Sequence, residues 1–191
     1  MSAEWESSRR SAVIATRILL ELMESSNPDH SRLIAGYLDA KRQLARAFQL
    51  FVTEESVDDG PFVAFVARLE MAAEAVYPRV PTRYRVVTGF GSAHRRLFGY
   101  LSEREERDVP IEELRLLTRD AVHTERRLRE LRDLGAVVAM SEVGGQRTCR
   151  MQLPVDLTTA AHEWIVRKVV ADGSLDDIAR EELLHMVDSP N

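Results

Sequence analysis

Cysteine is almost absent from this sequence: Cys149 is the only one among 191 residues, so no disulfide can form within the chain. No apolar run comes near the roughly 20 residues that a membrane-spanning helix requires. Residues 1–25 include Glu4, Glu6, Arg9 and Arg10 and lack the apolar core of a secretory signal peptide. These absences predict a cytoplasmic protein that has no membrane partner.

Aromatic residues, glycine and proline are also scarce. Aromatics make up 6% of the chain, which holds nine glycines and seven prolines. Alanine, leucine, glutamate and arginine dominate instead, and this choice of residues favours helices. With 45% hydrophobic and 30% charged residues, the composition is typical of a folded protein. We therefore expect a mainly α fold.

The sequence lacks the residue patterns of common catalytic sites. Asp39-Ala40-Lys41 has the acid-x-Lys spacing of some metal-dependent nucleases, but it falls in a predicted helix, where a solvated helix face explains it better. His162-Glu163 has no second histidine four residues away, and no Gly-x-Ser-x-Gly motif occurs. Cys149 is expected to be a buried structural thiol. We therefore expect a protein that is not an enzyme and uses no cofactor or metal ion.

The charge of the chain is unevenly distributed. The whole sequence has a net charge of −5. Residues 79–153 hold 15 arginines and 11 acids, which gives +4, whereas the rest holds 11 basic and 20 acidic residues, which gives −9. A surface that binds phosphate needs a local excess of positive charge, not a basic whole protein. The middle of the chain is therefore the expected nucleic-acid-binding part.

Apolar residues recur at helical spacing on both sides of this middle part. They predict three helices before Tyr77 and two after Pro154, over residues 8–23, 30–53, 62–76, 158–171 and 175–187. The first three are expected to share one core, built on Trp5, Phe48, Phe51, Phe62 and Phe65. Two prolines in 77–81 disfavour continued helix, so we expect a helical N-terminal segment over 1–78, a second domain over 79–154 and C-terminal helices over 155–191.

Within the middle part, we expect an extended stretch over 83–87 and a helix over 92–105 with Ser92 as its N-cap. Pro110 suits the first turn of the next helix, whose apolar face is supplied by Ile111, Leu114 and Leu117. After a turn at 118–120, a second helix is predicted over 121–134, with Asp120 as its N-cap. Gly135 is expected to end this helix in the left-handed conformation.

Two extended runs around Gly144-Gly145 follow directly and predict a β-hairpin. Because side chains alternate between the two faces of a strand, one set is expected to face the helices and a second set, made of arginines, to face outward. The first set is Val138, Met140, Cys149 and Met151, and the second is Arg147 and Arg150.

In this order of elements, residues 92–153 resemble the winged helix-turn-helix DNA-binding family of bacterial and phage regulators; similar modules are attached to restriction-type nucleases. The resemblance implies a mainly α protein in which a winged helix-turn-helix with a small β-hairpin wing lies between the helical N-terminal segment and the C-terminal helices. It also implies that duplex DNA is a partner, since the major groove admits one α-helix and residues at the start of the second helix approach the base edges.

On this resemblance, the residues expected to read bases are His123, Thr124, Arg126 and Arg127. Phosphate or minor-groove contacts are expected from Arg119, Gln146 and Arg147, with Arg95 and Arg96 beside them. The acids of the second helix, Glu125, Glu130 and Asp133, would repel phosphate unless Arg129 or Arg132 pairs with them at helical spacing.

These expectations favour a sequence-specific or general duplex DNA-binding protein, in the role of a transcriptional regulator. The alternative is a non-catalytic protein-binding subunit or adaptor of a larger defence or phage assembly. The acidic flanking helices would supply either a homodimer interface or a site for a protein partner, because palindromic DNA sites usually require a dimer. The helix over 30–53 is the expected contributor.

Overall fold

The computed structural model describes residues 2–27, 29–55, 59–118, 123–152 and 155–189. It divides into two compact units, Met1–Val57 and Asp58–Asn191. The fold is mainly helical, with one small three-stranded antiparallel sheet and helices at both ends, which confirms the expected fold class. Throughout the described ranges, no helix combines the length and the apolarity needed to cross a membrane.

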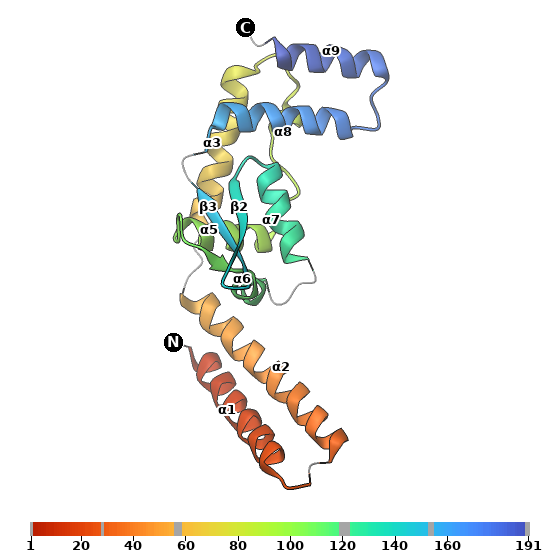
Figure 1. The fold of residues 1–191 in the computed structure, drawn as a ribbon. Helices are drawn as coiled ribbons and strands as arrows, with labels where there is room; N and C mark the ends of the chain where they lie inside the picture. The colour runs from red at the N-terminus through yellow and green to blue at the C-terminus, as the bar shows by residue number, and fades with distance from the viewer. Residues whose placement is uncertain (1, 28, 56–58, 119–122, 153–154, 190–191) are drawn as a thin grey trace. The chain divides into compact units, whose positions relative to one another are not determined.

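The first unit is a pair of antiparallel helices, α1 (Ala3–Glu24) and α2 (His30–Glu55), which lie side by side (Figure 1). Ser2 caps α1 by accepting a hydrogen bond from the Trp5 amide. Asp29 does the same for the Arg32 amide at the start of α2. The residues buried in this unit are small, namely Ser8, Ala12, Ala15, Ala40 and Ala47.

The second unit begins with α3 (Gly60–Val76), which does not share a core with α1 and α2. Phe62 and Phe65 pack on Phe98 of α5 (Ser92–Ser102), with ring centroids 5.6 and 4.9 Å apart. Trp5 packs on Phe51 inside the first unit, with centroids 5.3 Å apart. The aromatic residues expected to form one N-terminal core are thus divided between two cores, and the compact units differ from the expected boundary at residue 78.

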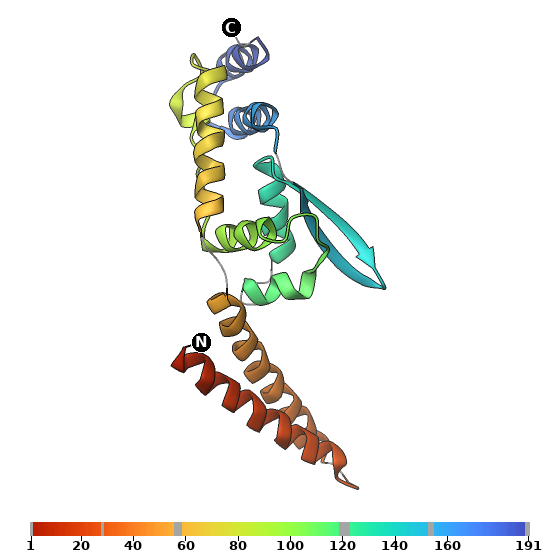
Figure 2. The same cartoon turned by 90° about the vertical axis from the view of Figure 1, so that its left-hand side faces the viewer.

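The C-terminal helices α8 (Leu157–Ala171) and α9 (Asp177–Asp188) complete the second unit rather than form a domain of their own. Helix α8 packs against α3, and α9 packs against α8 (Figure 2). Ile165, Val169 and Val187 are completely buried in these contacts. Because α8 covers the apolar face of α3, that face belongs to the core of the second unit.

Two local expectations between α3 and α5 are wrong. Residues 82–85 form one helical turn, α4 (Thr82–Arg85), instead of an extended stretch, since the fixed φ of the preceding Pro81 suits a helix start. Gly91, not Ser92, is the N-cap of α5, where its amide donates a 3.1 Å hydrogen bond to Nδ1 of His94. Helix α5 ends at Ser102, three residues before its expected end.

The sheet contains β1 (Val109–Pro110), β2 (Val137–Val143) and β3 (Gln146–Gln152) in the order β1-β3-β2, all antiparallel. Gly144 and Gly145 have φ of +60° and +79°, as the predicted tight turn requires. Pro110 pairs with β3 as part of β1, so it lies just before helix α6 (Ile111–Leu117) rather than within its first turn. Val138, Cys149 and Met151 are buried as expected, and Met140 is half-buried.

Candidate nucleic-acid interface

Helices α6 and α7 (Thr124–Asp133) both pack against α5 in the second unit. Both helices bury residues at three- to four-residue spacing: Ile111, Leu114 and Leu117 on α6, and Thr124, Leu128 and Leu131 on α7. Gly135 follows α7 with φ of +94°, so the predicted left-handed end of the helix is confirmed. The buried stripe fixes which side of α7 is left for solvent.

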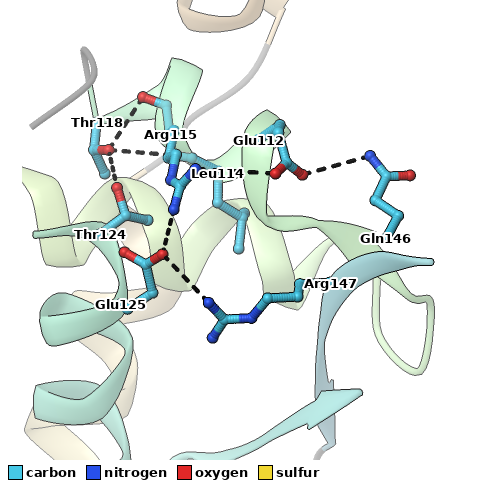
Figure 3. Close-up of polar contacts among 8 residues, drawn as sticks. All are labelled: Glu112, Leu114, Arg115, Thr118, Thr124, Glu125, Gln146 and Arg147. Atoms are coloured by element: carbon cyan, nitrogen blue, oxygen red, sulfur yellow. Dashed lines mark hydrogen bonds and ion pairs between the residues drawn. The ribbon is translucent and has the colours of Figure 1, made fainter. Parts of the chain in front are cut away.

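Thr124 is not available to read a base, contrary to expectation. It is 1% exposed, and its hydroxyl oxygen lies 2.8 Å from that of Thr118, which is also buried (Figure 3). Helix α7 begins at Thr124, three residues later than predicted, so Thr124 takes the first position of the buried stripe. His123 lies at the N-cap and is exposed. Arg119 and the predicted N-cap Asp120 lie outside the described residues.

The solvent side of α7 presents arginine. The side chain of Arg126 is 64% exposed, and Arg129 is exposed one turn further along, so the two lie on the same face of the helix. Arg127 is half-buried at the flank. Arg129 was expected only as a partner for acids, so its place beside Arg126 is a feature that the sequence interpretation missed.

Glu125, the first acid of α7, is held by arginines from α6 and the hairpin. One of its carboxylate oxygens accepts a 2.5 Å hydrogen bond from Arg115 and lies 4.0 Å from Arg147 (Figure 3). A backbone hydrogen bond at Glu125 and the Arg115 guanidinium lower the pKa of this carboxyl. The carboxylate is therefore ionised and neutralised from within the protein.

Glu130 is the most strongly paired acid of α7. It accepts hydrogen bonds from Arg126 at 2.9 Å and Arg127 at 2.7 Å, and His94 Nε2 of α5 lies 2.6 Å away. Burial raises the pKa of Glu130, but the hydrogen bonds from Arg127, His94 and Arg126 outweigh it and bring the pKa to about 2. Because Nδ1 of His94 accepts from Gly91, Nε2 carries the proton that Glu130 accepts.

Asp133, the last acid, forms an ion pair with Arg167 of α8. The acids are paired, but not in the way considered from the sequence, through Arg129 or Arg132: the described partners of Glu125 and Asp133 come from other elements, and those of Glu130 from α7 and α5. Helical spacing could have indicated Arg126 and Arg127 for Glu130, whereas the partners on other elements depend on tertiary packing. The consequence is that all three carboxylates of α7 are engaged inside the protein.

The β2–β3 hairpin contacts α6 and the start of α7 through polar side chains next to its turn. Gln146 donates a 3.4 Å hydrogen bond to Glu112 of α6, and Arg147 reaches Glu125 (Figure 3). Gln146 and Arg147 are both exposed, as predicted. Arg150, expected to point outward, is half-buried and bound to Asp108 through two hydrogen bonds of 2.5 and 3.2 Å. The hairpin therefore offers Arg147, but not Arg150, to a ligand.

The two further arginines expected at phosphate lie on α5. Arg95 is exposed and forms a 3.7 Å ion pair with Asp59, whereas Arg96 is half-buried. Helix α7, the arginines that pair with its acids, and Glu112, which pairs with Arg115, carry an excess of positive charge: seven arginines and four acids give a local charge of +3, not counting His94. These residues are Arg115, Arg126, Arg127, Arg129, Arg132, Arg147 and Arg167 against Glu112, Glu125, Glu130 and Asp133.

The part of the chain that the structure describes contains no group of three histidine, cysteine or acidic side chains able to hold a metal ion. Cys149 is fully buried, as predicted, and burial raises the pKa of its thiol to about 12. A thiol that stays protonated at neutral pH is a poor nucleophile.

Comparison with family models, with curated proteins and with solved structures found no match for this chain.

Proposed function

We propose that this protein binds duplex DNA through α7 and the β2–β3 hairpin and acts as a transcriptional regulator. The observation that carries the proposal is the arrangement of charge on α7. Arg126 and Arg129 occupy the solvent side, while Glu125, Glu130 and Asp133 are engaged by basic groups of the protein. A phosphate surface or a guanine edge would therefore meet guanidinium groups rather than unpaired carboxylates.

The order of elements supports the same function. Helix α6, helix α7 and a hairpin that follows directly are the parts expected of a winged helix-turn-helix. In this arrangement α7 would enter the major groove, where an arginine can donate two hydrogen bonds to guanine. We assign His123, Arg126 and Arg129 to the groove, and Gln146 and Arg147 to the backbone beside it. Arg127 would act mainly by holding Glu130.

A role on DNA agrees with the cytoplasmic location expected from the sequence. It also gives a reason for a dimer, because two copies of α7 would read two half-sites. The duplex partner and the homodimer are separate proposals, and each has its own experiment.

Charge reversal on α7 tests the DNA proposal. We expect Arg126→Glu with Arg129→Glu to weaken binding to a generic duplex by at least about 100-fold at low salt. The matched control is Arg68→Glu with Arg79→Glu, which changes the net charge equally at two exposed arginines outside the α6–α7–hairpin region. Equal binding by both double variants would refute the assignment to α7.

A second candidate function is the non-catalytic adaptor. It is favoured by α9, where Ile178 is 72% exposed beside the acids Asp177, Glu181 and Glu182. An apolar side chain surrounded by acids suits a basic protein partner. Failure of the wild-type protein to bind duplex DNA at low salt would support the adaptor function. Loss of DNA binding by the α7 charge-reversal variant, but not by its control, would argue against it.

A further inference from the structure

The contact between α1 and α2 is unusual in the size of its side chains. On α1 the residues facing α2 follow a heptad spacing through Trp5, Ser8, Ala12, Ala15, Leu19 and Leu22; on α2 they run through Leu33, Gly36, Ala40, Gln43, Ala47 and Leu50. Six of these twelve residues are small, namely Ser8, Ala12 and Ala15 on α1 and Gly36, Ala40 and Ala47 on α2. A Cβ added at Gly36 would lie 2.8 Å from Leu22, so the helices are close there. The small residues cluster in the middle of the contact, where Gln43 is the exception, and the larger ones lie toward its ends.

Seven further large apolar side chains lie together on one side of the pair. With Thr16 they form two stripes, also at heptad spacing: Val13, Thr16, Leu20 and Met23 on α1, and Ile34, Tyr37, Leu44 and Phe48 on α2. We call these eight residues the large-residue face. All eight are exposed, and members of both stripes line one groove of about 570 Å³, which shows that the stripes share a side.

The opposite side of the pair carries charged residues together with the exposed Ile14 and Ile18. Glu4 and Arg46 approach to 3.9 Å across the two helices there, and Asp39 pairs with Arg42 at 3.5 Å on α2. The large-residue face is therefore the more apolar of the two sides. The described residues that are buried in this unit are alanine or serine and remove little apolar surface from water, and units of this size usually need an additional source of stability such as oligomerisation.

The exposed area matches what a dimer requires. Side chains of this size that are about half exposed leave on the order of 100 Å² each, so the seven large apolar ones leave roughly 700 Å². A standard stable interface buries about 800 Å² on each partner. The large-residue face is therefore close to one complete side of such an interface.

The charge of the first unit permits contact with an identical unit. It carries seven basic and eight acidic residues, so two copies do not repel strongly. Lys41 is the charged residue within the α2 stripe; its long alkyl stem can lie along apolar neighbours while the ammonium reaches water. Arg9, beside the groove, is already paired with Glu6 at 2.8 Å. Arg17 also lines the groove, and its long side chain, like that of Lys41, can place its charge at the edge of a two-fold contact.

We propose that the large-residue face is the interface of a homodimer, in which two α1–α2 pairs form a four-helix bundle. The small side chains in the middle of each pair then alternate with the large ones between the pairs, as small and large layers do in a helical core. The proposal is independent of the proposed DNA contact, which involves other residues.

The mass of the full chain in solution tests this proposal. Light scattering after gel filtration should give twice the chain mass of 21.7 kDa. Leu20→Glu with Phe48→Glu places two charges in the interface and should raise the dissociation constant at least about 100-fold. The matched control is Ile14→Glu with Leu38→Glu, at residues 60% and 48% exposed but outside the large-residue face; it should remain a dimer.

A second measurement keeps the test informative if the interface variant unfolds. The wild-type midpoint of thermal unfolding should rise with protein concentration, as it does when folding and association are coupled. A wild-type monomer at about 100 µM, or an equal mass for the two double variants when both are folded, would overturn the proposal. If the wild-type complex contained one copy of this chain and a different protein, the large-residue face would belong to that partner. This result would also overturn the homodimer proposal.

Discussion

Thr118 and Thr124 join the end of α6 to the start of α7 through hydroxyl oxygens 2.8 Å apart, and both side chains are buried. Thr118 also donates toward the carbonyl oxygens of Leu114 and Arg115, each 3.2 Å away. The pair therefore sets the position of α7 relative to α6 although the two residues lie on either side of the turn. Because its hydroxyl is buried in this pair, Thr124 stabilises the packing of α7 on α6 and does not contact a ligand.

Replacing Thr124 with valine tests this role. The substitution keeps the shape of the side chain and removes the hydroxyl, so we expect unfolding in urea to become easier by about 1 to 2 kcal/mol. Binding of folded protein to a duplex should change by less than about threefold. A large loss of sequence discrimination with unchanged stability would restore Thr124 as a base-reading residue.

Gly135 and Gly144 form a matched pair of left-handed glycines with different surroundings. Gly135 has φ of +94°, and a Cβ there would lie 2.3 Å from Cβ of Ala160, whereas Gly144 has φ of +60° and open space around it. We expect Gly144→Ala to cost about 1 kcal/mol of backbone strain and Gly135→Ala clearly more. Denaturant unfolding of the two variants makes the comparison; equal losses would mean that α8 does not pack closely behind α7.

The sequence located the elements of the second unit well and the pairing of side chains poorly. The Gly135 stop and the Gly144-Gly145 turn were predictable because each depends on a few neighbouring residues. The burial of Thr124 was not, because the first turn of α7 starts three residues later than its apolar pattern suggests. Residues 119–122, where the predicted Arg119 contact and Asp120 cap fall, lie outside the described residues.

The remaining differences between the sequence-based predictions and the structure come from packing between distant parts of the chain. The partners of Glu125 and Asp133 come from α6, β3 and α8, and no local spacing indicates them. The division between α2 and α3 has a similar cause: the aromatic residues on both sides look alike in sequence, yet Phe51 packs on Trp5 while Phe65 packs on Phe98. Which aromatic residues share a core is decided by topology rather than by composition.

The stability of the fold should depend on pH through Glu130. Its pKa is about 2 in the folded protein and near 4.5 for an ordinary glutamate, so the unfolded chain binds more protons between these values. Stability contributed by this carboxylate is present above pH 4.5 and is lost as the pH falls toward 2. Glu130→Gln should be less stable than the wild type at pH 7, and this difference should shrink in acid. A constant difference in unfolding free energy from pH 7 to pH 3 would show that Glu130 is not held as described.

The same substitution should act in the opposite direction on DNA. Glu130→Gln releases Arg126 and Arg127 from their carboxylate and adds one positive charge beside the proposed contact face. We expect the affinity for a generic duplex to rise by about three- to tenfold at low salt, measured at a temperature where the variant is folded. Weaker binding by a folded Glu130→Gln protein would mean that the ion pairs position the arginines for DNA instead of competing with it.

The most direct test of the central claim is the salt dependence of binding to a duplex of about 30 base pairs, followed by fluorescence anisotropy between about 50 and 200 mM salt. If Arg126 and Arg129 in the groove and Arg147 at the backbone each displace counterions from the duplex, the logarithm of the association constant should fall against the logarithm of salt concentration with a slope of about −3 or steeper. Arg126→Ala with Arg129→Ala should make the slope shallower by about 2 for each protein copy bound. Absence of binding by the wild type at about 50 mM salt, or the same slope for both proteins, would contradict the account.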